Sequence, residues 1–149
     1  MSRLALVVAL VVALLPTACT SASDVCSAKK ALARTAWGEV GVRYALELSA
    51  AESAVREPTG RLAALSARPD APEEGKAALS GEIARAQEAV DLLQPKVNAA
   101  QTVSAAFTSG KASVARALAT ATSSSLEGED VGAAVARADD AAAACEGVD

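Results

Sequence analysis

The chain has 149 residues, of which 52% are hydrophobic and only 2% aromatic, with 14 basic side chains, 18 acidic side chains and no histidine. This length predicts a single domain, and the acidic balance without a basic cluster or aromatic platforms argues against nucleic-acid binding. The lack of histidine removes the commonest general base and the commonest neutral metal ligand, so we expect a non-enzyme without metal or cofactor.

Residues 1–18 have the composition of an export signal. Arg3 supplies one positive charge, residues 4–15 form an uninterrupted apolar run, and Pro16 closes that run. A helix that crosses a membrane needs about 18 apolar residues or more, so this run is too short to span. A basic start, a short apolar run and small residues after it are typical of a bacterial signal peptide. We therefore expect the protein to be exported.

The end of this segment, Leu15-Pro16-Thr17-Ala18-Cys19, resembles the lipobox of bacterial lipoproteins. The resemblance implies that Cys19 carries diacylglycerol and becomes the new N-terminus, which would anchor the protein on the outer face of the cell membrane. Pro16 departs from the family pattern, which has an aliphatic residue at that position. The alternative is ordinary signal-peptidase cleavage after Ala22, which would discard Cys19 and release a secreted or periplasmic protein.

Two cysteines remain on either route. Because Cys19 is lipidated or removed, Cys26 and Cys145 form an even pair in an exported chain. Such a pair is expected to be oxidised outside the cytoplasm, so the sequence predicts a disulfide. It would join the two ends of a domain at 26–149, which follows a short tether at 19–25.

The abundance of alanine and the scarcity of aromatic rings predict an all-α protein with a thin core. Two stretches place small or apolar residues at alternating spacings of three and four, which is typical of packed helices. They are Trp37, Gly41, Tyr44, Leu48, Ala51 and Val55, with Leu62 and Leu65 continuing the phase beyond Pro58, and Leu79, Ile83, Ala86, Val90, Leu93, Val97 and Ala100, with Phe107 keeping the phase. We expect helical arms at about 26–67 and 73–108.

The two stretches mirror each other about residue 72, beside a segment with two prolines that cannot lie inside a helix. The sequence therefore predicts a long antiparallel helical hairpin in which Trp37 meets Phe107. Pro58 and Pro95 lie within the arms and would kink or split them. The alternative architecture is a compact four-helix bundle in which these prolines divide the arms.

Two shorter helices are expected at about 111–122 and 130–146, each with an apolar stripe on one face. Residues 127–130 are mostly acidic, which suits the start of the last helix better than a calcium loop. If this helix returns along the hairpin, Cys145 arrives beside Cys26. The fold would then be four-helix-bundle-like, tied by one disulfide, with the 58–80 end protruding as a two-helix tip.

The three aromatic residues of the chain have two interpretations. Trp37, Gly41, Tyr44 and Phe107 would either pack a core or line an apolar cleft for a lipid or peptide. A glycine inside a helix costs about 1 kcal/mol relative to alanine, so Gly41 indicates close approach of another helix or a concavity.

These observations together favour a non-catalytic interaction or scaffold protein of the cell envelope. Its expected contacts are the membrane, through the lipidated N-terminus, and an envelope protein that the sequence does not identify. The alternative is a released or periplasmic helical carrier of a small apolar ligand. The exposed heptad seams could also be completed by a second copy of the chain, giving a homo-oligomer.

Overall fold

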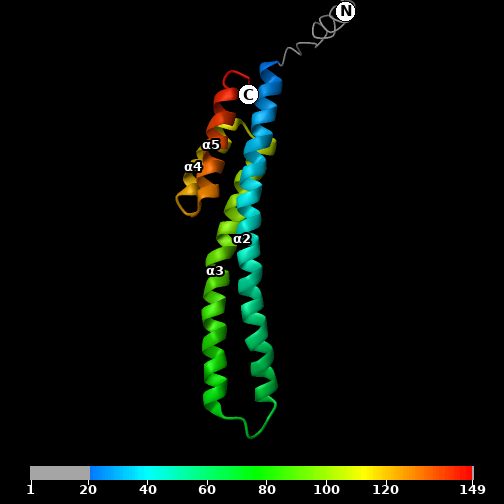
Figure 1. Ribbon diagram of the computed structural model, residues 1–149, viewed down its shortest axis with the longest axis vertical. Coiled ribbons are helices and arrows are strands. Elements are labelled where there is room, and N and C mark those ends of the chain that lie inside the picture. The colour runs from blue at the N-terminus through cyan, green and yellow to red at the C-terminus, as the bar shows by residue number, and fades with distance from the viewer. Residues whose placement is uncertain (1–20, 149) are drawn as a thin grey trace, which may run out of the picture.

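The computed structural model describes residues 21–148, so the signal segment and Cys19 lie outside the described residues. The described part contains four helices and no strand: α2 (Ala22–Ser66), α3 (Glu73–Ser109), α4 (Ala112–Ser123) and α5 (Glu129–Ala144). α2 and α3 form a long antiparallel hairpin, and α4 and α5 form a shorter hairpin beside one end of it (Figure 1). The expected all-α fold is thereby confirmed.

We call the four-helix part, residues 22–48 and 97–148, the head, and the remaining two-helix part, residues 49–96, the stalk. The first turn of α2 and the end of α5 both lie in the head, at the opposite end of the molecule from the turn between α2 and α3 (Figure 1). Among the described residues, no helix combines the length and the apolar character needed to cross a membrane.

Helix α2 begins at Ala22, four residues before the expected start at residue 26. A capping box explains this early start. The Ser21 hydroxyl accepts a hydrogen bond from the Asp24 amide at 3.1 Å, and the Asp24 carboxylate accepts one from the Ser21 amide at 3.1 Å. These bonds satisfy amide groups that the first turn of a helix otherwise leaves unpaired. The segment expected as a tether at 19–25 is therefore helical from Ala22 onward.

Both prolines lie inside continuous helices, Pro58 in α2 and Pro95 in α3. The arms are not divided, so the hairpin describes the molecule better than a compact bundle of split arms. Each proline removes one helical hydrogen bond. In the affected turn of α2, the Thr59 hydroxyl donates an additional hydrogen bond to the Val55 carbonyl at 2.6 Å. The Pro58 ring is itself buried, and that packing helps to offset the lost bond.

The heptad seams meet as expected, with a small shift in register. All the seam residues predicted on both arms are buried or half-buried. A Cβ atom added at Gly41 would lie 3.6 Å from the Ala100 Cβ, and one added at Gly75 would lie 3.3 Å from the Leu65 Cδ2. These pairs centre the hairpin at or just after residue 70. The expected mirror point at residue 72 was therefore one to two residues too late.

Nearly all of the buried apolar core lies in the head. The largest fully buried side chains are Trp37, Val40, Tyr44 and Val103. Around them pack alanines with no exposed surface: Ala33, Ala100, Ala112, Ala115, Ala119, Ala134, Ala138 and Ala141. Within the stalk only Pro58 and Leu79 are buried. The small alanine side chains let the four helices of the head approach closely, so a chain with few aromatic rings still forms a closed core.

Candidate functional site

The predicted disulfide between Cys26 and Cys145 is present, with 4.7 Å between the two Cα atoms. Cys26 lies in the second turn of α2, and Cys145 caps the C-terminal end of α5. Both side chains are buried. The bond therefore closes a loop across the whole described chain and fixes α5 against the first turns of α2.

Charged side chains reinforce this end of the head. The Lys29 ammonium lies 3.3 Å from the Asp140 carboxylate on α5. The Lys30 ammonium donates a hydrogen bond to the Gly110 carbonyl at 2.8 Å, in the turn between α3 and α4. Both lysines thus contact other parts of the head. Because the pairs are partly exposed, each contributes little to the free energy of unfolding.

The four residues expected either in a core or around a cleft lie in the core. Trp37, Tyr44 and Phe107 are at most 2% exposed, and Gly41 is buried against Ala100. They contact the other buried residues of the head, as the packing interpretation predicts. The sequence did not indicate one detail: the Trp37 Nε1 is buried and has no hydrogen-bond partner among the described residues. An unpaired buried N–H of this kind costs about 1 to 3 kcal/mol.

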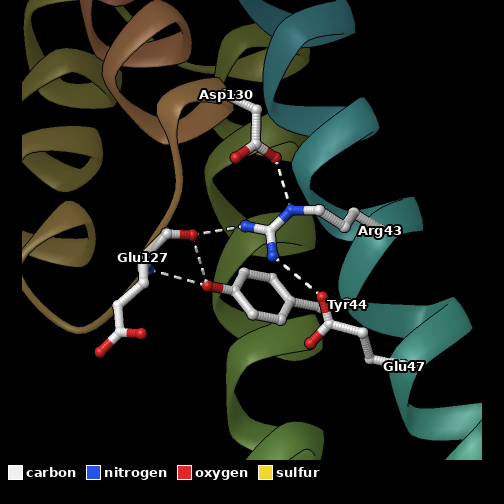
Figure 2. A network of polar contacts seen from close by, with 5 residues as sticks. All are labelled: Arg43, Tyr44, Glu47, Glu127 and Asp130. Carbon is white, nitrogen blue, oxygen red and sulfur yellow. Dashed lines mark hydrogen bonds and ion pairs between the residues drawn. The ribbon is translucent and has the colours of Figure 1, made fainter.

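A polar network joins the middle of α2 to the turn before α5 (Figure 2). The Tyr44 hydroxyl accepts a hydrogen bond from the Glu127 amide at 2.8 Å and donates one to the Glu127 carbonyl at 3.0 Å. The Arg43 Nη2 donates to the same carbonyl at 2.6 Å. The Arg43 guanidinium also lies over the Tyr44 ring, 4.1 Å from its centre, in a cation–π contact.

The same guanidinium binds two carboxylates. Arg43 Nε donates to Asp130 at 2.7 Å, and Arg43 Nη1 donates to Glu47 at 3.0 Å (Figure 2). The hydrogen bond from Arg43 lowers the pKa of Asp130 below its ordinary value, and the same bond raises the pKa of Arg43. We call Arg43, Tyr44, Glu47, Glu127 and Asp130 the latch. All three guanidinium nitrogens are occupied, so the latch holds α5 in place rather than presenting a free cation.

Gly128 allows the turn of the latch to pass close to Arg43. Its φ angle is 121°, a conformation that favours glycine. A Cβ atom there would collide with the Asp130 carboxylate and would lie 3.0 Å from the Arg43 Nη2. Sequence reasoning placed the acidic residues 127–130 at a helix start. It missed the latch because Arg43 is far away in the chain and no local pattern links the two segments.

Three hollows lie on the surface of the described residues, and one of them, of about 340 Å³, lies between the start of α2 and the end of α3, where Cys26 and Phe107 are among its lining residues. Another, of about 600 Å³, lies between the start of α4 and the end of α5 and is lined by both charged and small residues, including Lys111, Arg116 and Asp139. A third, also of about 340 Å³, lies near the end of the stalk. We call it the tip hollow, and it is lined by Arg61, Leu65, Gly75, Ala78, Leu79 and Glu82.

No group of three or more cysteine, aspartate or glutamate side chains in the described part of the chain is placed to hold a metal ion. Comparison of the chain with protein-family models, with curated proteins and with solved structures finds no match.

Proposed function

We propose that the protein is a non-catalytic scaffold of the bacterial cell envelope, anchored through a lipid on Cys19, with the stalk as its interaction surface. The observation that carries this proposal is the position of the Ser21 capping box. Only Thr20 separates Cys19 from Ser21, so the long helix begins directly beyond the proposed anchor. A stiff helix mounted at its first turn suits a protein that holds a surface at a fixed distance from a membrane.

The same capping box supports processing at Cys19 over the alternative cleavage. Cleavage after Ala22 would remove Ser21, which caps α2, and would leave the first-turn amides without their side-chain partner. Processing at Cys19 keeps the complete box. Loss of an N-cap of this kind costs about 1 kcal/mol, so the folded helix favours the longer mature chain.

The dimensions of the hairpin fit a spacer. Helix α2 has 45 residues and is therefore about 67 Å long. The disulfide and the latch fix α5 against the half of α2 that lies near the proposed anchor. The stalk projects from this head without further helices around it (Figure 1). A partner could thus reach the stalk without contacting the lipid.

The chemistry of the side chains supports a non-catalytic role. The chain has no histidine, and its three aromatic residues serve the core and the latch. The charged groups around Arg43 are paired with one another, and the bonds to Glu127 and Asp130 join α2 to α5 and the turn before it.

The intact mass of the mature protein from a bacterial host tests the proposal. We expect a chain that begins at Cys19 and carries diacylglycerol, recovered in the membrane fraction, with a gain of about 2 Da on reduction of the disulfide. A Cys19→Ala variant is the matched control, and it should leave the membrane fraction while keeping the fold. A wild-type chain that begins at Ser23 and carries no lipid would overturn the anchor and favour the released carrier.

A further inference from the structure

One face of the α2–α3 hairpin is covered in the head and bare in the stalk. On α2, Cys26, Ala33 and Val40 recur every seven residues and are buried, and Cys26 is bonded to α5. In a heptad-packed pair of helices, residues seven apart lie along one line. This line continues into the stalk through Ala54 and Arg61, which are exposed. We call its continuation, with the adjoining surface of α3, the stalk face.

The part of the stalk face on α3 carries an exposed leucine and a hollow. Ala78, Arg85 and Leu92 lie seven residues apart, and the Leu92 side chain is 63% exposed. Ala78 lines the tip hollow together with Arg61, so the hollow opens on the same face. At 1.5 Å per residue, Leu92 and Ala78 are about 21 Å apart along the helix.

This arrangement is self-complementary. Leu92 and the tip hollow, whose lining includes Leu65 and Leu79, are too far apart to meet within one chain. They can meet across two copies, and they do so twice when the second copy runs antiparallel. We infer that two copies of the chain pack antiparallel through the stalk face, with Leu92 of each copy in the tip hollow of the other. The two-fold axis would pass close to Arg85, midway between Leu92 and Ala78 in the sequence.

The shape of the molecule favours this register. In the hairpin, Arg85 lies at about the same height as Glu57, as the pairing of Gly41 with Ala100 indicates. An axis at this height brings the tip of each copy to the place where α4 and α5 of the other copy end, at the latch. The second stalk would then cover the same face that α4 and α5 cover in the head. Four helices would then surround the long axis of the dimer from one end to the other.

The charges on the stalk face do not oppose this packing. Glu57 lies two heptads beyond Arg43, which contacts α5 in the head, so Glu57 belongs to the same face. At the axis, two Arg85 and two Glu57 side chains would meet, and their charges cancel. Arg61 and Glu82, of opposite sign, both line the tip hollow around Leu65 and Leu79.

The size of the stalk face sets the expected affinity. The free length of α2 in the stalk, from residue 49 to residue 66, is about 27 Å, and two helices side by side are about 20 Å wide. Two copies would therefore bury roughly 1,000 Å², which is at the lower end of specific interfaces. We expect a reversible dimer with a dissociation constant on the order of 10 to 100 µM.

The inference concerns the stalk alone and holds whether or not Cys19 is lipidated. In the antiparallel dimer the two N-terminal ends of α2 lie at opposite ends of the rod. Each is separated from the two-fold axis by the length of α2 between Ala22 and Glu57, so the two are roughly 100 Å apart. For the anchored protein proposed above, the dimer would thus join chains that stand on two facing membrane surfaces. For a released protein it would form a free rod.

Cross-linking of paired cysteines tests the orientation. In the double variant Ala78→Cys/Leu92→Cys of the mature protein, the new thiols are too far apart to be joined within one chain by a short bis-maleimide. An antiparallel pair should give a closed dimer, whereas a head-to-tail arrangement would give a ladder of larger species. The matched control is Ser80→Cys/Gln94→Cys, with the same spacing on the opposite face of α3, and it should give neither product.

Equilibrium sedimentation tests the contact. Leu92→Glu should weaken self-association by at least about tenfold, because a charge would replace the apolar side chain in the hollow. Val114→Glu is the matched control, since Val114 is also 63% exposed but lies on α4, and it should leave the dissociation constant unchanged. Ala78→Trp fills the tip hollow, which receives Leu92 of the other copy, and should also abolish the dimer. Circular dichroism would establish that each variant is folded.

Besides the head-to-tail ladder, three results would overturn the inference, and none of them bears on the lipid anchor. The first is a wild-type protein that stays monomeric up to about 1 mM, where even a weak interface of this size should associate. The second is a dimer that neither Leu92→Glu nor Ala78→Trp weakens. The third is equal cross-linking of the control pair, which would indicate contact without a preferred face.

Discussion

The head and the stalk are built from the same two helices, yet they are stabilised in different ways. In the head, four helices surround the seam, and Trp37, Val40 and Tyr44 are almost completely buried. In the stalk, the seam residues are mostly half-buried, and only Pro58 and Leu79 are classed as buried, with Leu79 still 7% exposed. The heptad spacing sets which residues face each other. How much each residue contributes to the free energy of unfolding depends on how many helices enclose it.

The backbone of the two regions differs as well. Gly60 and Gly81 lie at the same height in the stalk, and a Cβ atom at either would have no neighbour within 4 Å. Pro58 lies in the same turn as Gly60. In the head, by contrast, Gly41 lies in contact distance of α3, and Gly128 in the latch has a backbone conformation that favours glycine. We therefore expect the stalk to open locally at lower free energy than the head.

Loss of the disulfide should reduce the stability of the head more than any other change considered. Cys26 and Cys145 are separated by 119 residues, so the Cys26→Ser/Cys145→Ser variant should lose about 4 to 5 kcal/mol of the free energy of unfolding. The reason is that the open chain has more conformational freedom when unfolded. Urea unfolding followed by circular dichroism measures this loss. An unchanged midpoint would mean that packing alone stabilises the head.

Enlarging Gly41 tests whether the head is close-packed. A methyl group there would make an ordinary contact with the Ala100 Cβ at 3.6 Å, so Gly41→Ala should be neutral or slightly stabilising. Gly41→Leu should destabilise the protein by about 1 to 3 kcal/mol, because the longer side chain must displace α3. Thermal unfolding of both variants checks the contrast. A fully stable Gly41→Leu protein would show that the seam has room for a ligand-sized side chain.

Alanine at the open glycines of the stalk should narrow the difference in local stability between the stalk and the head. The double variant Gly60→Ala/Gly81→Ala should stabilise the stalk by about 0.5 to 1 kcal/mol per site, because alanine has less freedom in the unfolded chain. Hydrogen exchange should slow for stalk amides and change little in the head. Gly132→Ala, at an equally open position on α5, is the matched control, and its effect should be confined to the head.

The latch should give the smallest effect, and it should depend on pH. The hydrogen bond from Arg43 lowers the pKa of Asp130, so its contribution is present above the ordinary pKa of an aspartate and is lost as the pH falls through the lowered value. The Asp130 side chain is 37% exposed, so we expect less than about 1 kcal/mol. The difference in unfolding free energy between wild type and Asp130→Asn should shrink from pH 6 to pH 2.5.

The conservative substitution Tyr44→Phe serves as the control for the latch. It removes the hydroxyl that binds Glu127 but leaves the Arg43–Asp130 pair, so its cost should not vary with acid pH in the same way. A pH-independent difference for Asp130→Asn would contradict the role assigned to the ion pair.

Much of this architecture could be predicted from local patterns in the sequence. The hairpin could be identified from the spacing of Trp37, Tyr44 and Leu48 and of their partners on α3. Residues at this spacing lie on one face of a helix, whatever the rest of the molecule does. The count of cysteines identified the pair Cys26 and Cys145, because only one disulfide is possible between the two cysteines that remain when Cys19 is set aside. The polar turn after α2 was likewise evident from its prolines.

Other features depended on contacts between distant segments. The prolines at 58 and 95 would end many helices, and they are tolerated here because each helix is held by a partner along its length. The latch joins Arg43 to Glu127 and Asp130, which no local spacing relates. The choice between a core and a cleft at Gly41 likewise required the position of Ala100. The sequence by itself determined which residues would face a neighbouring helix, since periodicity is a property of the chain. Only the tertiary structure decided how many helices surround each stretch, since burial is a property of the assembled fold.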